Sequence, residues 1–322
     1  MLLTRNLLYT AITRAQRMVI LSHANPDGDA VGSSIAWAEA LRREGHDVVC
    51  IVPNKYPYYL DWMTGIRDIV IYRNEAERAA KAVAEADVIF CLDFHTLSRL
   101  DALGDVIAAN TVARRVLIDH HLDPSQDFDI IFSHPESSST CFLVYSIIEA
   151  LWGAQSVTAT QAEVLYVGMM TDTGNFSYGP CTQDVYLIIS MLLQKEINKD
   201  RIYNKVFNNY SEGRLRLMGY VLYEKMRVFP EQHAALITLS RKEMARFNFN
   251  KGDSEGLVNI PLQMKGIYFS AFLREDTEKD LIRVSLRSQG TFPCNKFAAQ
   301  YYNGGGHLNA SGGQYEGTLN EA

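Results

Sequence analysis

Residues 115–121 read RVLIDHH, a short apolar run that ends in Asp119, His120 and His121. A run of this length and composition predicts a buried strand. Two adjacent imidazoles and a carboxylate at a strand end are hard to explain by packing, because imidazoles prefer polar partners and neighbouring side chains diverge. The stretch therefore predicts an α/β domain with a candidate site where the strand ends.

Similar apolar runs surround this one, at residues 18–22, 48–52 and 88–93, and helical patterns separate them, the first from Ala30 to Glu44. Strands that alternate with helices predict a mostly parallel sheet. Further helical patterns at residues 138–152, 160–170 and 182–195 complete an α/β domain.

A second, smaller α/β domain is expected after this one. Residues 198–227 are helical in pattern and increasingly charged, which is typical of a connector. We place the boundary near Ser211, with one domain at residues 1–210 and the other at 211–322. The second contains strand-like runs at 233–239, 266–273 and 281–288 and a helical stretch at 293–302.

Composition excludes several classes of protein. Hydrophobic residues make up 47% and charged residues 21% of the 322 residues, as in ordinary folded proteins. The net charge of -6 argues against binding long duplex nucleic acid. The five cysteines show no C-x-x-C spacing, no run is long enough to span a membrane, and Arg5, Arg14 and Arg17 interrupt the apolar N-terminus. We expect reduced thiols, a cytoplasmic location and no membrane contact.

Carboxylates gather where the predicted strands and helices end, together with His23. They are Asp27, Asp29, Asp93, Asp119 and Asp172. Each alone fits a turn or a helix cap. Together at one sheet edge they would repel one another and raise their own pKa values unless cations intervened. With imidazoles in the set and no cysteine expected near it, we expect two divalent cations, Mn²⁺ ahead of Fe²⁺ or Zn²⁺.

These motifs resemble those of the DHH phosphoesterase superfamily: H-x-x-x-D-x-D from His23, the strand-end Asp93, D-H-H from Asp119 and T-D-T-G-x-F from Thr171. The resemblance covers about residues 18–180. It implies a first metal on His23, Asp27 and Asp93. It implies a second metal on Asp29, Asp93, His120 and Asp172, so that Asp93 bridges the two. It further implies that Asp119 supports this ligand set and that His121 faces the substrate phosphate, where it would stabilise or protonate the leaving oxygen.

The second predicted domain has its own candidate site, formed by Arg287 and the segment Gly304-Gly305-Gly306-His307. Glycines let backbone amides approach an anion closely, while Arg287 and His307 would supply donors and positive charge. The triplet alone could equally be a flexible hairpin turn. After a DHH domain, it resembles the DHHA1 substrate-binding domain.

The short two-domain layout resembles the nanoRNase and pAp-phosphatase group. This implies a manganese-dependent phosphoesterase for short single-stranded oligoribonucleotides and 3'-phosphoadenosine 5'-phosphate (pAp). Cyclic di-AMP and its linear product pApA stay open as substrates. Polyphosphate fits an acidic chain less well, and pyrophosphatases of the superfamily carry a different second domain. The non-enzymatic alternative is a nucleotide sensor. The oligomeric state stays open, with a homodimer among the alternatives.

Overall fold

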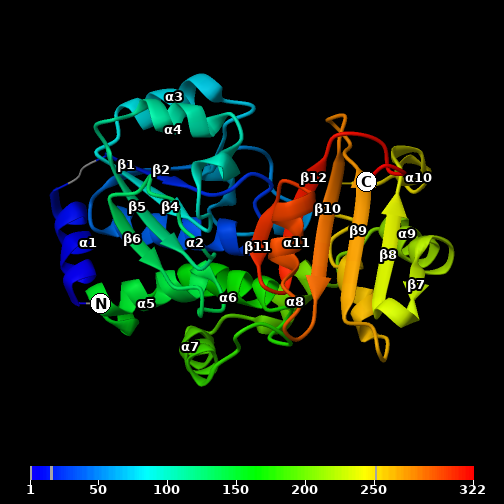
Figure 1. The fold of residues 1–322 in the computed structure, drawn as a ribbon. Coiled ribbons are helices and arrows are strands. Elements are labelled where there is room, and N and C mark those ends of the chain that lie inside the picture. The colour runs from blue at the N-terminus through cyan, green and yellow to red at the C-terminus, as the bar shows by residue number, and fades with distance from the viewer. Residues whose placement is uncertain (1, 15–16, 251) are drawn as a thin grey trace. The chain divides into compact units, whose positions relative to one another are not determined.

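The computed structural model describes residues 2–14, 17–250 and 252–322, which form two compact units (Figure 1). The first unit ends at Asn208, and the second runs from Asn209 to Ala322. The boundary placed after residue 210 by sequence falls at the start of the second unit. The side chains of Arg5 and Arg14, which bear on the expected lack of a leader peptide, lie outside the described part of the chain.

The first unit is built on a six-stranded sheet of order β3-β2-β1-β4-β5-β6, in which each neighbouring pair runs parallel. Its strands are β1 (Arg17–Leu21), β2 (Asp47–Val52), β3 (Val70–Ile71), β4 (Val88–Leu92), β5 (Arg114–Asp119) and β6 (Ile130–Ser133). The expected parallel sheet is confirmed. Strands β3 and β6 have no predicted counterpart, because two and four residues are too few to show a period.

Helices cover both faces of this sheet. They are α1 (Leu2–Arg14), α2 (Gly28–Arg43), α3 (Ala76–Ala84), α4 (Leu103–Ala109), α5 (Thr140–Trp152), α6 (Ala159–Asp172), α7 (Gln183–Leu193) and α8 (Lys199–Val206). Phe90 packs into a core with α2, α5 and α6, whereas its neighbours Ile89 and Cys91 pack into a core with α3 and α4. Figure 1 shows these helix groups on opposite sides of the sheet. Burial on both faces explains why the strands are continuous apolar runs.

The second unit is built on another six-stranded sheet, of order β11-β12-β10-β9-β8-β7. Its elements are α9 (Glu212–Tyr220), β7 (Arg227–Phe229), β8 (Ala234–Leu239), α10 (Arg241–Arg246), β9 (Phe269–Glu275), β10 (Ile282–Ser288), α11 (Cys294–Tyr301), β11 (Gly305–His307) and β12 (Ala310–Tyr315). Strands β8 and β9 are parallel and the other neighbours antiparallel. The predicted fold class, a mostly parallel α/β domain followed by a smaller α/β domain, is confirmed. The segment Gly305–His307 is a strand rather than a flexible turn.

Among the described residues, no helix combines the length and apolar character that crossing a membrane requires.

Candidate metal centre

The candidate ligands lie at the carboxyl end of the parallel sheet. His23 follows β1, Asp93 comes directly after β4, and Asp119 is the last residue of β5. The chain runs outward from β1 through β2 and β3, then returns to build β4, β5 and β6 on the other side. Ligands of open α/β sheets bind beyond the strand ends at such a reversal of strand order.

Helices α2 and α6 bring in the remaining candidates. Asp27 caps α2, because its side chain accepts hydrogen bonds from the backbone N–H groups of Asp29 and the residue after it, at 3.0 and 3.1 Å. Asp29 lies buried in the first turn of α2, and Asp172 is the last residue of α6. A Cβ at Gly28 would lie 2.4 Å from the Thr171 hydroxyl oxygen, so glycine allows the start of α2 to approach the end of α6.

His23, Asp27 and Asp93 form a first ligand group, whose potential ligand atoms all lie within 4.8 Å of one another. His23 Nδ1 lies 3.0 Å from the carbonyl oxygen of Ala24, an acceptor, so this nitrogen carries the hydrogen. The other nitrogen, Nε2, lies 3.4 Å from Asp93 Oδ2. The ring is therefore held with Nε2 towards the ligand group, the orientation that a metal-binding histidine requires.

Asp29, His120 and Asp172 form a second ligand group of the same size. His120 Nε2 lies 3.4 Å from Asp93 Oδ1, 3.4 Å from Asp172 Oδ2 and 3.8 Å from Asp29 Oδ2. Two ligand atoms that each lie about 2.1 Å from one transition-metal ion are about 3.0–3.4 Å apart at octahedral or tetrahedral angles. Most of these separations fall close to that range, so the donor set fits a divalent cation.

Asp93 belongs to both ligand groups. Its Oδ2 faces His23 and its Oδ1 faces His120, and the residue is 1% exposed. Its backbone φ of +66° lies in the left-handed region, which non-glycine residues seldom occupy. Strained backbone of this kind is found at functional sites when the surroundings enforce it. The geometry gives Asp93 the position of a bridging ligand.

The carboxylates of the cluster differ in their pKa values. Burial opposes the charged form of Asp93, but hydrogen bonds with His120 and His23 outweigh it and hold the pKa of this carboxyl well below its usual range. Burial, and then the charge of Asp93, raises the pKa of Asp29 well above its usual range. Burial also raises the pKa of Asp172 to about 6, with Asp27 and Asp93 contributing. Burial opposes the charged form of His120, but the neighbouring carboxylates outweigh it and raise the pKa of this histidine well above its ordinary value. Without cations, protons offset the carboxylate charge, and cations that bind must displace them.

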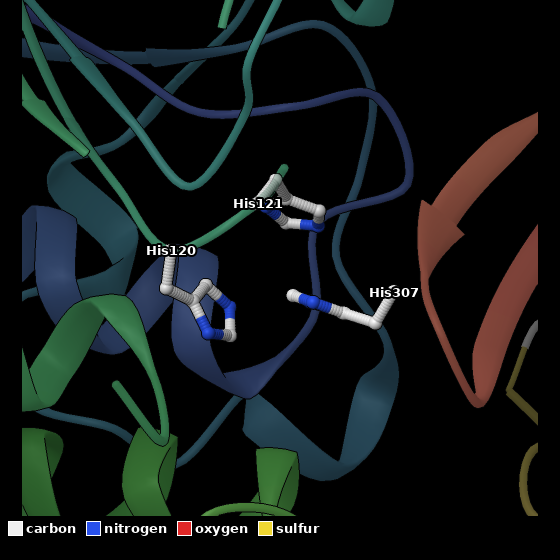
Figure 2. Close-up of side chains that lie close together, drawn as sticks. All are labelled: His120, His121 and His307. Atoms are coloured by element: carbon white, nitrogen blue, oxygen red, sulfur yellow. The ribbon is translucent and has the colours of Figure 1, made fainter. Parts of the chain in front are cut away.

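Asp119 and His121 form a hydrogen-bonded pair beside the ligand groups. His121 Nδ1 donates to Asp119 Oδ1 at 2.8 Å, and Asp119 is fully buried. His95 stacks on His121, with ring centroids 5.7 Å apart and planes at 28°. Figure 2 shows the imidazoles of His120 and His121 leaving the same loop in different directions, and their planes differ by 74°. The two adjacent imidazoles therefore face different surroundings.

The partner of Asp119 differs from the expected one. The resemblance implies that this carboxylate supports the metal ligands, but its hydrogen bond goes to His121. His120 Nδ1 instead lies 3.3 Å from the carbonyl oxygen of Ser137, which orients Nε2 towards the second ligand group. Neighbouring side chains diverge, so one carboxylate does not orient both rings.

Sequence reasoning missed the contribution of Thr140. The composition of the run from Ser137 to Thr140 is typical of a helix N-cap, and Ser139 does cap α5, accepting from the backbone N–H of Phe142 at 3.0 Å. Thr140, however, contacts two candidate ligands, Asp29 and Asp93. A polar run that follows a strand of the parallel sheet would have indicated that Thr140 lies near the ligands. Because β6 was not predicted, the run could not be placed at that edge of the sheet.

One argument for Mn²⁺ also needs correction. No cysteine was expected near the cluster, but Cys141 Sγ lies 3.6 Å from the backbone oxygen of Asp29. Burial, and then the charge of Asp29, raises the pKa of this thiol well above its usual range. A protonated thiol that donates to a carbonyl is not a metal ligand, because metals bind the thiolate. The donor set stays oxygen and imidazole.

In the second unit, sheet register places Arg287 and His307 in one row. Arg287 on β10 and His307 on β11 both pair with Ala310 on β12. Directly paired residues share a face of the sheet, so both side chains lie on the face that carries Ala310. Small residues occupy the next row on that face, Ser285, Gly312 and Gly305. This face combines a cationic side chain and an imidazole with a floor of small residues, an arrangement that suits an anion.

The three glycines of the triplet are not equivalent. A Cβ at Gly304 would lie 2.0 Å from the backbone oxygen of Gly312, and one at Gly306 would lie 2.6 Å from that of Ala310. Gly306 also has a φ of +137°. At Gly305 a Cβ would meet nothing within 4 Å. Packing against β12 thus accounts for two of the glycines, and Gly305 is where an external group has room to approach.

This difference predicts opposite outcomes for two alanine substitutions. Gly304→Ala should lower the free energy of unfolding by about 1–3 kcal/mol or more, because the methyl group overlaps the backbone of β12. Gly305→Ala should change it by less than about 0.5 kcal/mol, as is usual at sites without such contacts, and should weaken phosphate binding severalfold. Urea unfolding and nucleotide titration of both variants test this. Equal loss of stability in the two would contradict the packing argument.

Two family models match the chain. That of the DHH family, N-terminal domain, matches residues 17–169, and that of the DHHA1 domain matches residues 232–322. The first covers the parallel sheet and most of the candidate ligands. The second covers Arg287 and the glycine triplet.

Similar proteins extend over nearly the whole chain. The bifunctional oligoribonuclease and PAP phosphatase NrnA of Bacillus subtilis is 24% identical, over 95% of this chain and 91% of its own. The protein of the same name from Thermus thermophilus is 26% identical, over 92% and 84%. A crystal structure of an exopolyphosphatase-related protein from Bacteroides fragilis is 49% identical, covers 100% and 93%, and superimposes with a TM-score of 0.92.

Proposed function

Since the chain belongs to the DHH/DHHA1 family of phosphoesterases, we propose that it hydrolyses short oligoribonucleotides and 3'-phosphoadenosine 5'-phosphate, with two divalent cations, Mn²⁺ by preference. Relatives that carry both activities in their names support the substrate class. Mixed carboxylate and imidazole ligands support a transition metal over Mg²⁺ alone.

The observation that carries this proposal is the position of Asp93 between the two ligand groups. Its two oxygens face His23 on one side and His120 on the other. His23 and Asp27 would complete one cation site, and Asp29, His120 and Asp172 the other. Bound there, divalent cations would lower the pKa of water and offset charge on the reacting phosphate.

His121 would act on the leaving group. Its Nδ1 donates to Asp119, so Nε2 is the nitrogen that can face a substrate. When the ring is protonated, Nε2–H can donate to the oxygen that departs from phosphorus. The Asp119 carboxylate, which accepts from Nδ1–H, stabilises the positive charge of that imidazolium. The stack with His95 limits rotation of the ring.

The second unit would bind a phosphate of the substrate. Arg287 and His307 share a face with Gly305, where a ligand has room to approach the backbone. Guanidinium groups match phosphate oxygens in geometry and charge. Such a site selects substrates that carry a phosphate beyond the bond that is cleaved, as pAp and 5'-phosphorylated oligoribonucleotides do.

Polyphosphate is the second candidate substrate, because the Bacteroides fragilis protein that is 49% identical is described as exopolyphosphatase-related. A polyphosphate chain favours a continuous series of cationic groups. Arg283, on the same face as Arg287, is already paired with Asp276 at 2.6 Å. This pairing offsets the charge of one arginine on that face, so we rank polyphosphate below nucleotides.

The proposal includes a reducing, cytoplasmic compartment. All five cysteines are free, and Cys50, Cys91, Cys141 and Cys294 are buried. Burial raises the pKa of Cys50 to about 12, so this thiol is protonated at neutral pH. Unpaired thiols of this kind are typical of cytoplasmic proteins.

A substrate panel tests the proposal. Purified metal-free protein is incubated with pAp, pApA, 5'-phosphorylated di- to pentaribonucleotides, cyclic di-AMP, pyrophosphate and polyphosphate, each with Mn²⁺, Mg²⁺ or Zn²⁺. We expect pAp and the short oligoribonucleotides with Mn²⁺ to give the highest rates, and EDTA to abolish them. Faster cleavage of polyphosphate would favour the second candidate. Nucleotide binding without turnover would identify a sensor and overturn the proposal.

A further inference from the structure

We infer that Thr140 is a positioning residue for the second ligand group, and that the two cation sites therefore differ in their dependence on it. The inference rests on the proposed two-cation function. Thr140 is fully buried at the first position of α5, directly after the capping residue Ser139, in the connection that follows β6.

Thr140 contacts two candidate ligands through different atoms. Its hydroxyl donates to Asp93 Oδ1 at 3.0 Å, and its backbone N–H donates to Asp29 Oδ2 at 2.6 Å. The next residue, Cys141, donates its backbone N–H to Asp29 Oδ1 at 2.8 Å. Both oxygens of the buried Asp29 carboxylate are thus held by the first turn of α5.

The same segment orients a third ligand. The carbonyl oxygen of Ser137 lies 3.3 Å from His120 Nδ1 and directs the opposite nitrogen towards the second ligand group. Residues 137–141, the ligand-holding segment, therefore contact Asp29, Asp93 and His120. Within Asp93 the contact is with Oδ1, the oxygen that faces His120 rather than His23.

Two members of the first ligand group, His23 and Asp27, are oriented by their own surroundings, and only the shared Asp93 contacts Thr140. His23 donates to the carbonyl of its neighbour Ala24, and the Asp27 side chain accepts from the first turn of α2. These contacts do not pass through the ligand-holding segment. A change in that segment should therefore act unequally on the two cations.

The hydrogen bond from the Thr140 hydroxyl orients Asp93 Oδ1. A carboxylate oxygen has two lone pairs, and a hydroxyl that occupies one lone pair of Oδ1 leaves the other directed towards the second ligand group. Partners that orient ligands typically contribute 10- to 100-fold to metal affinity. Thr140→Val keeps the shape of the side chain but replaces the hydroxyl with a methyl group, so it removes this hydrogen bond alone.

The experiment compares wild type, Thr140→Val and Thr140→Ser by Mn²⁺ titration of metal-free protein, with free Mn²⁺ measured by electron paramagnetic resonance. We expect wild type to bind two ions. Thr140→Val should bind one ion with a Kd within about twofold of wild type and the other 10- to 100-fold more weakly. Thr140→Ser keeps a hydroxyl and should restore most of the second affinity.

Thr158→Ala is the control for a purely structural effect, since Thr158 lies outside the ligand-holding segment and caps α6 through Gln161, at the opposite end of that helix from Asp172. It should lower the melting temperature of the metal-free protein and leave both Mn²⁺ affinities at their wild-type values. Should Thr140→Val fail to fold, Thr140→Ala replaces it.

Equal weakening of both ions in Thr140→Val, or no weakening, would overturn the inference and leave the proposed function standing. Failure of wild type to bind two Mn²⁺ ions would overturn the proposed function, and the inference with it.

Discussion

The Asp93→Asn variant is expected to lose on the order of 10³-fold or more in kcat/KM. A bound divalent cation contributes several kcal/mol of charge stabilisation in the transition state, and each 1.4 kcal/mol or so corresponds to a tenfold change in rate. Asp93 faces both ligand groups, so removal of its charge weakens both cation sites at once. Steady-state kinetics on pAp across a range of Mn²⁺ concentrations measures this loss.

Asparagine is the appropriate replacement because of the backbone. Asp93 has a φ of +66°, a conformation that asparagine adopts more readily than alanine. Asparagine also keeps an oxygen that can accept from the Thr140 hydroxyl. The loss of activity can then be assigned to charge rather than to strain, which Asp93→Ala would add.

A matched control exists at Asp101, an exposed aspartate that also has a positive φ, of +49°. Asp101→Asn makes the same chemical change at another residue with positive φ, outside both ligand groups. It should retain wild-type kinetics. Activity of Asp93→Asn within tenfold of this control would rule out a bridging role for the carboxylate.

The gathering of ligands at one sheet edge was predictable from sequence because it follows from topology. Asp93 and Asp119 each end a strand, and parallel neighbouring strands end at the same edge. His23 and Asp27 follow another strand of that sheet. No side-chain detail is needed for this step, only the recognition of alternating strands and helices.

The hydrogen-bond partners within the site were not predictable in the same way. Whether Asp119 orients His120 or His121 depends on side-chain torsions in one loop, and sequence spacing does not report torsions. The role of Thr140 depends on β6, a strand too short for its pattern to be seen. The features that could not be predicted from sequence are therefore mostly the hydrogen bonds that orient the candidate ligands.

The glycine triplet shows a third limit of prediction from sequence. Its sequence fits both a turn and an anion site, and the structure adds a strand pairing that neither interpretation contains. Gly304 and Gly306 are explained by the backbone of β12, which lies against them. A pattern of glycines indicates close approach of some backbone or ligand, but it does not identify which.

The Asp119→Asn variant is expected to lose about 10²- to 10⁴-fold in kcat while Mn²⁺ affinity stays within about twofold of wild type. The carboxylate accepts the Nδ1 hydrogen of His121, whereas an asparagine side chain can turn its NH₂ group to the ring and favour the tautomer with hydrogen on Nε2. With Nδ1 occupied as an acceptor, the ring cannot be the doubly protonated imidazolium that gives a proton to the leaving oxygen. Rapid-mixing kinetics at saturating Mn²⁺, with Mn²⁺ titration of the same sample, measures both quantities.

A double-mutant cycle with His121→Gln identifies which histidine Asp119 serves. If the carboxylate acts through His121, the double variant should be about as slow as His121→Gln alone, because residues that act as a unit are not additive. If Asp119 instead supports the metal ligands, Asp119→Asn should weaken Mn²⁺ binding 10- to 100-fold and the two losses in rate should multiply. The first outcome follows from the 2.8 Å hydrogen bond between Asp119 and His121, and from the Ser137 carbonyl that already orients His120.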